Sequence, residues 1–375
     1  MTEFLRLAGA VEGEGQDAGV AAHYGNPTLE QRALEAGRAV VDLSQRAVLT
    51  ITGEDRLTWL DSLTSQSLRG LAAGESAETL LLDPNGRLEH AVRVLDDGVT
   101  AWLLVERGQA DPLLTWLQRM RFMLRVEPED RSADYATVAT FGDPVALGLP
   151  VAAPNGVPLA WRDPWDAVRP GGHQYSHAED HPGVAWRETE VLVARDDVAT
   201  VARRVAAGEL AVAGTLALEA LRIAAWRPRF GAEVDERSIP HELDWLRTAV
   251  HLTKGCYRGQ ETVAKVHNLG KPPRRLVLLH LDGSDAILPG PGAAVLAPRD
   301  GEDPVPVGVV TSSALHHELG PVALAVIKRS VSPEAQLIVI AEDVRIAAAQ
   351  EVIVPPDAGA VANVPRLPRL GGVSR

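Results

Sequence analysis

The sequence predicts an α+β fold with antiparallel sheets, followed by a small C-terminal β-barrel or sandwich. Three observations favour this class. Strands in the first 130 residues are joined by tight turns rather than by helices, and from residue 272 on short apolar runs alternate with Gly, Pro and Asp. The chain of 375 residues also exceeds what one core usually supports, while a hydrophobic content of 46% is enough to fill two or three cores.

The N-terminal part predicts a strand, a helix and then a three-stranded antiparallel meander. The strand at 48–53 (VLTITG) alternates apolar and polar residues, and leucines at helical spacing follow it. The meander consists of three apolar runs separated by Asp/Gly turns, at 78–82 (ETLLL), 87–95 (RLEHAVRVL) and 99–106 (VTAWLLVE). An amphipathic helix with Pro112 in its first turn completes this part at 110–122.

The middle of the chain is less regular. Residues 142–184 are rich in Pro and Gly and predict a loop-rich connection, after which 188–197 (ETEVLVARDD) predicts a strand. Residues 214–226 (GTLALEALRIAAW) carry an apolar stripe at helical spacing, without a breaker, and predict a helix.

The C-terminal part has four short apolar runs after Lys271, separated by Gly, Pro and Asp, and this pattern predicts a small β-barrel. We therefore expect four segments: a loose tail at 1–20, an α+β body at 21–270, a barrel at 271–351 and a second loose tail at 352–375. The two tails are assigned from their content of Gly, Ala, Pro and charged residues.

Composition excludes several classes of function. A formal net charge of −13 and a pI near 5.3 oppose binding to a nucleic acid backbone over most of the surface. The N-terminus lacks the basic flank and apolar run of a signal peptide, and no stretch of eighteen apolar residues is free of charge. We expect a cytoplasmic protein that binds neither nucleic acid nor membrane.

No metal site is predicted. His173, His177 and His181 recur at four-residue spacing, but Pro-Gly pairs bracket them and the segment lacks apolar periodicity, so a surface loop is favoured over a metal-binding helix. The pair His316 and His317 is interpreted as part of a turn.

Cys256 is the single cysteine of the chain, which excludes an internal disulfide and an all-cysteine metal site. The segment GQETVAKVHN after it predicts a short helix starting near Gly259, with Glu261 in the first turn. A thiol before a helix N-terminus, beside Lys254 and Arg258, meets the conditions for a lowered pKa and for reactivity. The alternative is a small buried hydrophobe, and the local residues leave both interpretations open.

The stretch KGCYRGQE (254–261) resembles the K-G-C-Y-x-G-Q-E signature of the YgfZ family. These are folate-binding relatives of the glycine cleavage T-protein, an aminomethyltransferase, and are linked to the maintenance of iron–sulfur enzymes. Every fixed position of the signature is present. The resemblance extends to 220–242 and to the N-terminal ITGEDRLTWLDSLTSQ (51–66), and covers roughly residues 38 to 350.

The resemblance implies two related folate-binding subdomains around a central opening, followed by a C-terminal β-barrel. It implies tetrahydrofolate as cofactor, iron–sulfur enzymes as partners and Cys256 as the functional, catalytic centre. The residues expected to hold the folate are Lys254, Tyr257, Arg258, Gln260, Glu261, Arg222 and Lys265. Six basic residues against one acid in 254–275 are expected to attract the anionic glutamate tail.

Three positions depart from the aminomethyltransferase pattern. His90 and Ala91 stand where those enzymes carry an acidic pair, and Ala224 stands where their Arg-x-Glu-x-Gly motif carries a glutamate. A general acid/base carboxylate contributes typically 10²- to 10⁴-fold to a rate, so aminomethyl transfer is disfavoured. The alternatives kept are a tetrahydrofolate-dependent aminomethyltransferase and a folate-free interaction scaffold.

Overall fold

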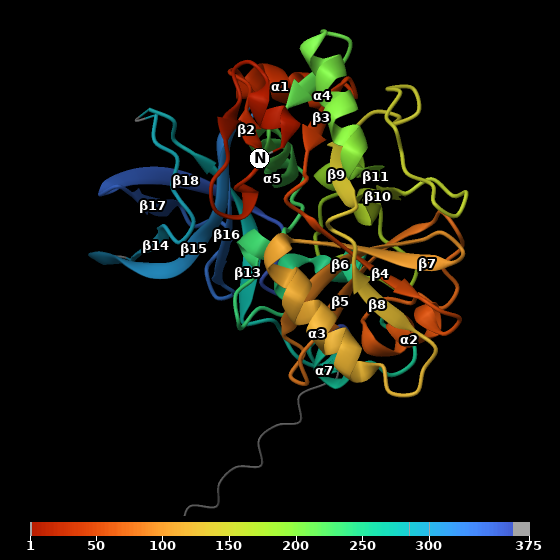
Figure 1. Ribbon diagram of the computed structural model, residues 1–375. Helices are drawn as coiled ribbons and strands as arrows, with labels where there is room; N and C mark the ends of the chain where they lie inside the picture. Colours follow the sequence, from red (N-terminus) through yellow and green to blue (C-terminus); the bar gives the residue numbers. More distant parts are fainter. Residues whose placement is uncertain (1, 285, 300, 363–375) are drawn as a thin grey trace, which may run out of the picture.

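The computed structural model describes residues 2–284, 286–299 and 301–362. Three parts meet at one junction: two five-stranded sheets, each with its own helices, and a closed barrel (Figure 1). This confirms the predicted α+β class with antiparallel sheets and a C-terminal barrel.

The first sheet has the strand order β5-β6-β7-β4-β8, and every neighbouring pair in it is antiparallel. Its strands are β4 (Ala47–Thr52), β5 (Ser76–Leu82), β6 (Leu88–Asp96), β7 (Thr100–Val105) and β8 (Glu127–Asp130). The helices α2 (Arg56–Leu63) and α3 (Ala110–Met120) bury their leucines against it. The predicted strand, helix, meander and second helix of this part are confirmed, because each rests on local periodicity and turn residues.

The second sheet has the order β10-β11-β9-β3-β12, in which only β12 and β3 are parallel. Its strands are β3 (Ala39–Asp42), β9 (Tyr135–Thr140), β10 (Ala160–Arg162), β11 (Thr189–Ala194) and β12 (Ala211–Ala213). Its helices are α1 (Pro27–Glu35), α4 (Val198–Ala206) and α5 (Thr215–Ala224), and α5 confirms the helix predicted at 214–226. Side chains of both sheets, including Trp102 and Leu192, form a shared apolar cluster, so the sheets pack as one body.

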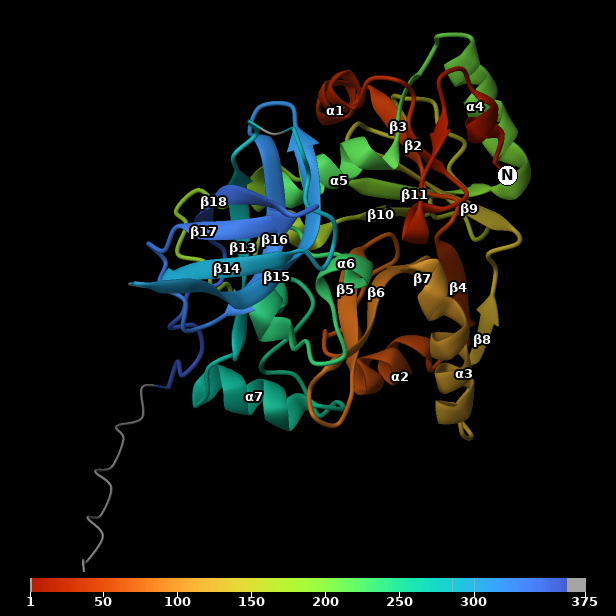
Figure 2. The ribbon, with the colours of Figure 1, turned by 90° about the vertical axis from the view of Figure 1, so that its left-hand side faces the viewer.

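The barrel closes in the order β13-β16-β15-β14-β17-β18. Its strands are β13 (Arg274–Leu281), β14 (Ala294–Arg299), β15 (Glu302–His316), β16 (Gly320–Lys328), β17 (Leu337–Ala341) and β18 (Val344–Val352). The short helices α6 (Phe230–Glu233) and α7 (Gln260–Asn268) lie where the barrel meets the body (Figure 2). Helix α7 starts directly after Gly259, with Glu261 in its first turn, as the sequence predicts.

The expectation of a loose N-terminal tail is wrong for residues 2–20. A one-turn 3-10 helix (Glu3–Arg6) buries Phe4 completely, the strands β1 (Val11–Glu12) and β2 (Ala21–His23) pair, and a second 3-10 turn (Gly15–Asp17) lies between them. Composition describes the segment as polar and glycine-rich, but its few apolar and acidic side chains find partners far away in the sequence, which composition does not reveal.

The C-terminal expectation is also wrong in part. Ile353 and Val354 are fully buried, and the backbone N–H of Val354 donates to Leu276 O of β13. Residues 363–375 of the predicted tail lie outside the described residues. In the part of the chain that is described, no helix has the length and apolar character to cross a bilayer.

The histidine segment is not simply a surface loop. His177 is exposed, but His181 is buried between Trp165 and Trp226, and its Nδ1 accepts from the N–H of Gly183. The Pro-Gly pairs correctly predict an irregular backbone. This irregular segment is nevertheless partly buried, because His181 packs against two tryptophans. Trp226 is itself a buried core residue.

Candidate functional site

The signature segment 254–261 lies against the hairpin turn between β5 and β6. Gly259 has a φ of +84°, and a Cβ at this position would stand 2.6 Å from Asp83 O and 3.1 Å from the Cα of Gly86. Gly255, by contrast, has open space around it. Only the second of these two glycines is therefore required by local packing.

Cys256 is exposed, so the interpretation as a buried hydrophobe is wrong. The two cations expected to activate the thiol have other partners. Lys254 is buried, and its Nζ donates to the backbone oxygens of Asp61, Thr64 and Gln66, at 2.8 Å for Thr64 and 2.7 Å for Gln66. Burial lowers the pKa of Lys254, and the charge of Asp61, 3.5 Å away, opposes that shift.

Arg258 forms a two-bonded ion pair with Glu89 of β6 and lies over the ring of Trp116. Both Nη groups of Arg258 donate to the carboxylate of Glu89, so they are not available to hold a ligand carboxylate in the same two-bonded way.

The other residues of the signature region divide between core and surface. Tyr257 is buried, and burial raises its pKa. The Gln260 side chain donates to Lys254 O at 3.3 Å and so closes the turn before α7. Glu261 and Lys265 are exposed on α7.

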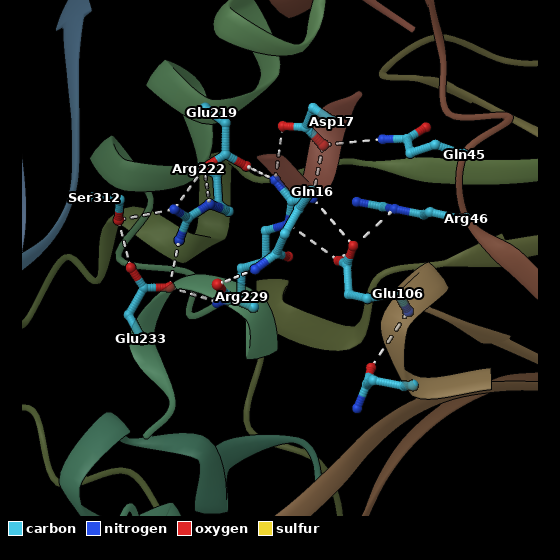
Figure 3. A network of polar contacts seen from close by, with 12 residues as sticks. Gln16, Asp17, Gln45, Arg46, Glu106, Glu219, Arg222, Arg229, Glu233 and Ser312 are labelled. Carbon is cyan, nitrogen blue, oxygen red and sulfur yellow. Dashed lines mark hydrogen bonds and ion pairs between the residues drawn. The ribbon is translucent and has the colours of Figure 1, made fainter. Parts of the chain in front are cut away.

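Arg222 belongs to a buried polar network rather than to a ligand site. It lies on α5, is 4% exposed, and donates to Glu219 (2.7 Å from Nη2), Glu233 (2.9 Å) and Ser312 of the barrel (2.9 Å) (Figure 3). These partners are all internal, so Arg222 ties the second sheet's helix to α6 and to the barrel.

Arg229, which sequence reasoning missed, is the centre of the same network. Its guanidinium contacts Glu106 after β7, Glu219 of α5 and Asp17 of the N-terminal segment, at 2.8–3.2 Å (Figure 3). Burial raises the pKa of Glu106, but Arg229 and Arg46 outweigh that effect and hold it well below its usual range. The one available signal was the clustering of Arg222, Arg227 and Arg229 in eight residues.

Two pockets open beside this network. The first, here called the central pocket, has a volume of about 500 Å³ and is lined by Gln16, Glu106, Arg107, Gln109, Phe230 and Gly231, among others. The second, the arginine pocket, has about 470 Å³ and is lined by Gln45, Arg46, Arg107, Asp111, Asp130 and Arg195, among others. They share Ala18 and Arg107. None of the eight residues predicted for the site lines either pocket.

A smaller cavity adjoins the central pocket and shares Glu106, Gln109 and Phe230 with it. Ala91 lines this cavity, which places one of the three positions that depart from the aminomethyltransferase pattern next to the pocket. Arg227 and Trp245 also line it, and each has a buried N–H without a hydrogen-bond partner among the described residues, at Nη1 and Nε1. The cavity has a volume of only about 10 Å³, so these two donors face a space no larger than a water molecule needs.

His90, a second of the three departing positions, is a neutral imidazole. Burial lowers its pKa to about 4. Its Nδ1 lies 3.4 Å from Gln109 Nε2, and its ring lies parallel to that of Phe230 with centroids 6.3 Å apart.

The comparisons with known proteins agree with this fold. The chain is 29% identical over 315 residues to an aminomethyltransferase of Synechococcus sp. strain RCC307, covering 81% of this chain and 82% of the relative. An aminomethyltransferase of Nostoc sp. strain PCC 7120 is 26% identical, with 82% of each chain covered. A chloroplastic protein of Arabidopsis thaliana, named only as a transferase, is 24% identical over 91% of this chain and 77% of its own length.

Among solved structures, the glycine cleavage system aminomethyltransferase T of Bartonella henselae superposes with a TM-score of 0.73, covering 94% of this chain and 96% of that chain at 17% identity. No protein-family model matches the chain. The chain is thus homologous to aminomethyltransferases and shares the T-protein fold.

Proposed function

We propose that this aminomethyltransferase homologue binds a tetrahydrofolate in the central pocket, supports iron–sulfur enzymes, and does not transfer an aminomethyl group. The observation that carries folate binding is the composition of the central pocket and its adjoining cavity. An aromatic face and two side-chain amides converge in the central pocket of about 500 Å³, and the adjoining cavity adds a water-sized space, which is the usual make-up of a small-molecule site.

The residues fit a reduced pterin. Phe230 would supply the apolar face for the ring, and Gln16 and Gln109 would supply hydrogen-bonding amides. A bound tetrahydrofolate would supply a carrier for a one-carbon unit, and these residues would bind and orient it.

Transfer chemistry lacks its carboxylate. His90 is neutral near pH 7 and, with a pKa of about 4, is a weak base, and Ala91 has no polar group. The nearby carboxylates do not replace the missing pair. Glu89 is paired with Arg258, and Asp83 accepts from the backbone of Asn85 and Arg87 within its own turn. Glu106, which lines the central pocket, is held by Arg229, and its pKa lies well below the usual range, so it is a poor proton acceptor. Without a positioned acid or base, a rate loss of about 10²- to 10⁴-fold follows.

The role towards iron–sulfur enzymes rests on the signature and on the exposure of Cys256 next to the open space at Gly255. An exposed thiol can contact another protein, whereas a buried one cannot. In this proposal Lys254 does not activate the thiol; it holds the signature segment 254–261 in place through its bonds to backbone oxygens.

Folate binding is tested by calorimetric titration with tetrahydrofolate under anaerobic conditions. We expect saturable binding, weakened at least tenfold by Phe230→Ala. Phe122→Ala is the matched control, because Phe122 is 81% exposed and lines neither pocket. Absence of binding by the wild type would overturn the proposal and leave the folate-free scaffold as the better interpretation.

The second candidate function, aminomethyl transfer, is favoured by the similarity to aminomethyltransferases. It is tested by supplying tetrahydrofolate and an aminomethylated lipoyl carrier protein and assaying methylenetetrahydrofolate. We expect no product above the uncatalysed rate. Product at enzymatic turnover would establish the transferase and contradict the carboxylate argument.

The iron–sulfur role is tested in cells that lack the protein, by measuring the activity of iron–sulfur enzymes after complementation. We expect rescue by the wild type and by Thr253→Ala, an exposed neighbour, and reduced rescue by Cys256→Ser. Full rescue by Cys256→Ser would remove Cys256 from the function.

A further inference from the structure

An exposed apolar turn follows the end of α3. Phe122, Met123 and Leu124 are 81%, 98% and 43% exposed. The backbone N–H of Leu124 donates to Arg121 O at 3.0 Å, which closes a β-turn with Phe122 and Met123 at its two central positions. We call residues 121–124 the apolar turn. Consecutive apolar side chains that contact only solvent are costly on a protein surface and indicate an interaction site.

The backbone of Phe122 is strained as well as exposed. Its φ is +45°, in the left-handed region that glycine and asparagine tolerate and that is an outlier for a bulky residue. Strained positions of this kind persist where the surrounding structure holds them, and they cluster at functional sites. Neither burial nor backbone preference therefore accounts for a phenylalanine at this position.

The base of the apolar turn is fixed to the body. Arg125 pairs with Glu54 and donates to both carboxylate oxygens of Asp55, just before α2. Gly53 packs so closely on this segment that an added Cβ would lie 2.0 Å from Arg125 O. A turn held in this way has little conformational entropy to lose on binding, which favours association.

Two free cations flank the apolar turn. Arg119 and Arg121 are exposed, and neither has a hydrogen bond or an ion pair with another residue in the described ranges. Arg125, by contrast, is neutralised by its two acids. Phe, Met and Arg are side chains enriched in protein interfaces. The surface is thus complementary to an apolar hollow with carboxylates at its rim.

The same surface continues towards the signature segment. Trp116 and Arg119 are three residues apart on α3 and so share a face of the helix. The Cζ of Arg258 lies 5.9 Å from the ring centroid of Trp116, and the exposed Cys256 is two residues before Arg258. Figure 2 shows the end of α3 and helix α7 at the same lower end of the molecule. A partner on the apolar turn would therefore lie at the end of the molecule that carries Cys256.

We infer that the apolar turn anchors a docking surface for a partner protein. Phe122 inserts into an apolar hollow of that protein, and carboxylates at the rim of the hollow pair with Arg119 and Arg121. A protein can place carboxylates opposite these two cations alone, whereas an anionic bilayer carries charge over its whole plane and would also face the acids at the base of the turn. The inference goes beyond the proposed function, since it requires neither bound folate nor an iron–sulfur partner.

The first test uses the protein alone. Asparagine adopts left-handed backbone far more readily than phenylalanine, so Phe122→Asn should leave the urea midpoint of unfolding unchanged or raise it. A phenylalanine kept for stability would lower the midpoint when replaced. A lower midpoint for Phe122→Asn would therefore overturn the inference.

The second test identifies the partner and then measures its binding. Photoreactive benzoylphenylalanine in place of Phe122 is irradiated in the cells from which the chain comes, and the protein in the adduct is purified and titrated. The same group in place of Val145, an apolar residue 79% exposed elsewhere, should give no adduct. Phe122→Asp should weaken binding of the purified partner by about thirtyfold or more. Arg121→Glu should weaken it by about fivefold, mainly through slower association and with a smaller dependence on salt.

Both variants should bind tetrahydrofolate as the wild type does, because the apolar turn lines neither pocket. No adduct at position 122, an adduct only with a second copy of this chain, or partner binding unaffected by Phe122→Asp would each overturn the inference. So would binding to phosphatidylglycerol vesicles that Phe122→Asp abolishes, because the turn would then be a membrane anchor. A partner that binds as expected but holds no iron–sulfur cluster would support the docking surface and contradict the iron–sulfur role, so the two proposals can fail separately.

Discussion

Arg222 shows at the residue scale how an arginine chosen for ligand binding can belong to the core. Its guanidinium is enclosed by Glu219, Glu233 and Ser312. Replacing it with methionine leaves the buried Glu233 and the partly exposed Glu219 short of a partner, so Arg222→Met should lower the free energy of unfolding by about 3–5 kcal/mol. Lys265→Met, at an exposed position, should change it by less than about 0.5 kcal/mol. Urea unfolding of both variants checks this, and similar small losses in both would contradict it.

A second prediction at the residue scale concerns His90 and the pH dependence of the free energy of unfolding. Its pKa of about 4 in the folded chain lies below the unfolded value of about 6.5. The unfolded chain therefore takes up this proton first, and stability is lost as pH falls below 6.5. Between about pH 7.5 and about pH 5 the loss through this one group is about 2 kcal/mol.

The variant His90→Gln lacks this titration, and the other buried acids and histidines cancel in the comparison. The difference in unfolding free energy between wild type and variant should therefore be about 2 kcal/mol smaller near pH 5 than near pH 7.5. Chemical denaturation at both pH values measures it. An unchanged difference would show that His90 has the same pKa in the folded chain as in the unfolded chain.

The residue roles of the signature could be predicted only in part. The motif located Cys256, and the structure finds it exposed. Sequence spacing placed Lys254 and Arg258 next to the thiol, but their long side chains reach other partners: three carbonyl oxygens near the end of α2 and the carboxylate of Glu89. Proximity in sequence does not determine where a flexible charged side chain ends.

At the scale of elements, two glycines in the signature allow a matched test. Gly259 combines a φ of +84° with a close approach to Asp83 O, whereas a Cβ at Gly255 would point into open space. Gly259→Ala should destabilise the chain by about 1–3 kcal/mol, because alanine is strained in that conformation and would push the hairpin turn away. Gly255→Ala should stay within about 0.5 kcal/mol.

Thermal or urea unfolding of the two glycine variants distinguishes them. Equal stabilities would mean that α7 does not depend on its contact with the β5–β6 turn. The comparison also isolates this contact from Cys256, which neither substitution changes.

Elements defined by local patterns were predictable, and elements defined by distant partners were not. The meander β5-β6-β7 follows from alternation and Asp/Gly turns, and α5 follows from its apolar stripe. The strand β12 is three residues long and pairs in parallel with β3, more than 160 residues earlier in the sequence. So short a strand has no pattern of its own, and its pairing depends on the surrounding sheet.

At the scale of the whole molecule, the candidate site is assembled from parts that the sequence keeps apart. The central pocket takes residues from the N-terminal segment, from the turn after β7 and from α6. Each contributes a few side chains that are ordinary by themselves. The class of the fold and the position of the barrel could be read from the sequence, but a pocket between three segments could not, because no periodicity links them.

The N-terminal segment lines both pockets, and this couples ligand binding to the order of that segment. Thr2, Ala18 and Gly19 line the arginine pocket, and Gly15, Gln16 and Ala18 line the central one, with Asp17 held on Arg229. A ligand that binds only when the N-terminal segment is packed against the pockets must slow the release of that segment.

Bound folate should therefore slow backbone amide exchange with deuterium in residues 12–20. Mass spectrometry of peptides from this region would measure it, and exchange unaffected by a saturating ligand would show that the ligand lies elsewhere. The dissociation rate of the folate would then be set, in part, by how often this one stretch of chain lifts from Arg229.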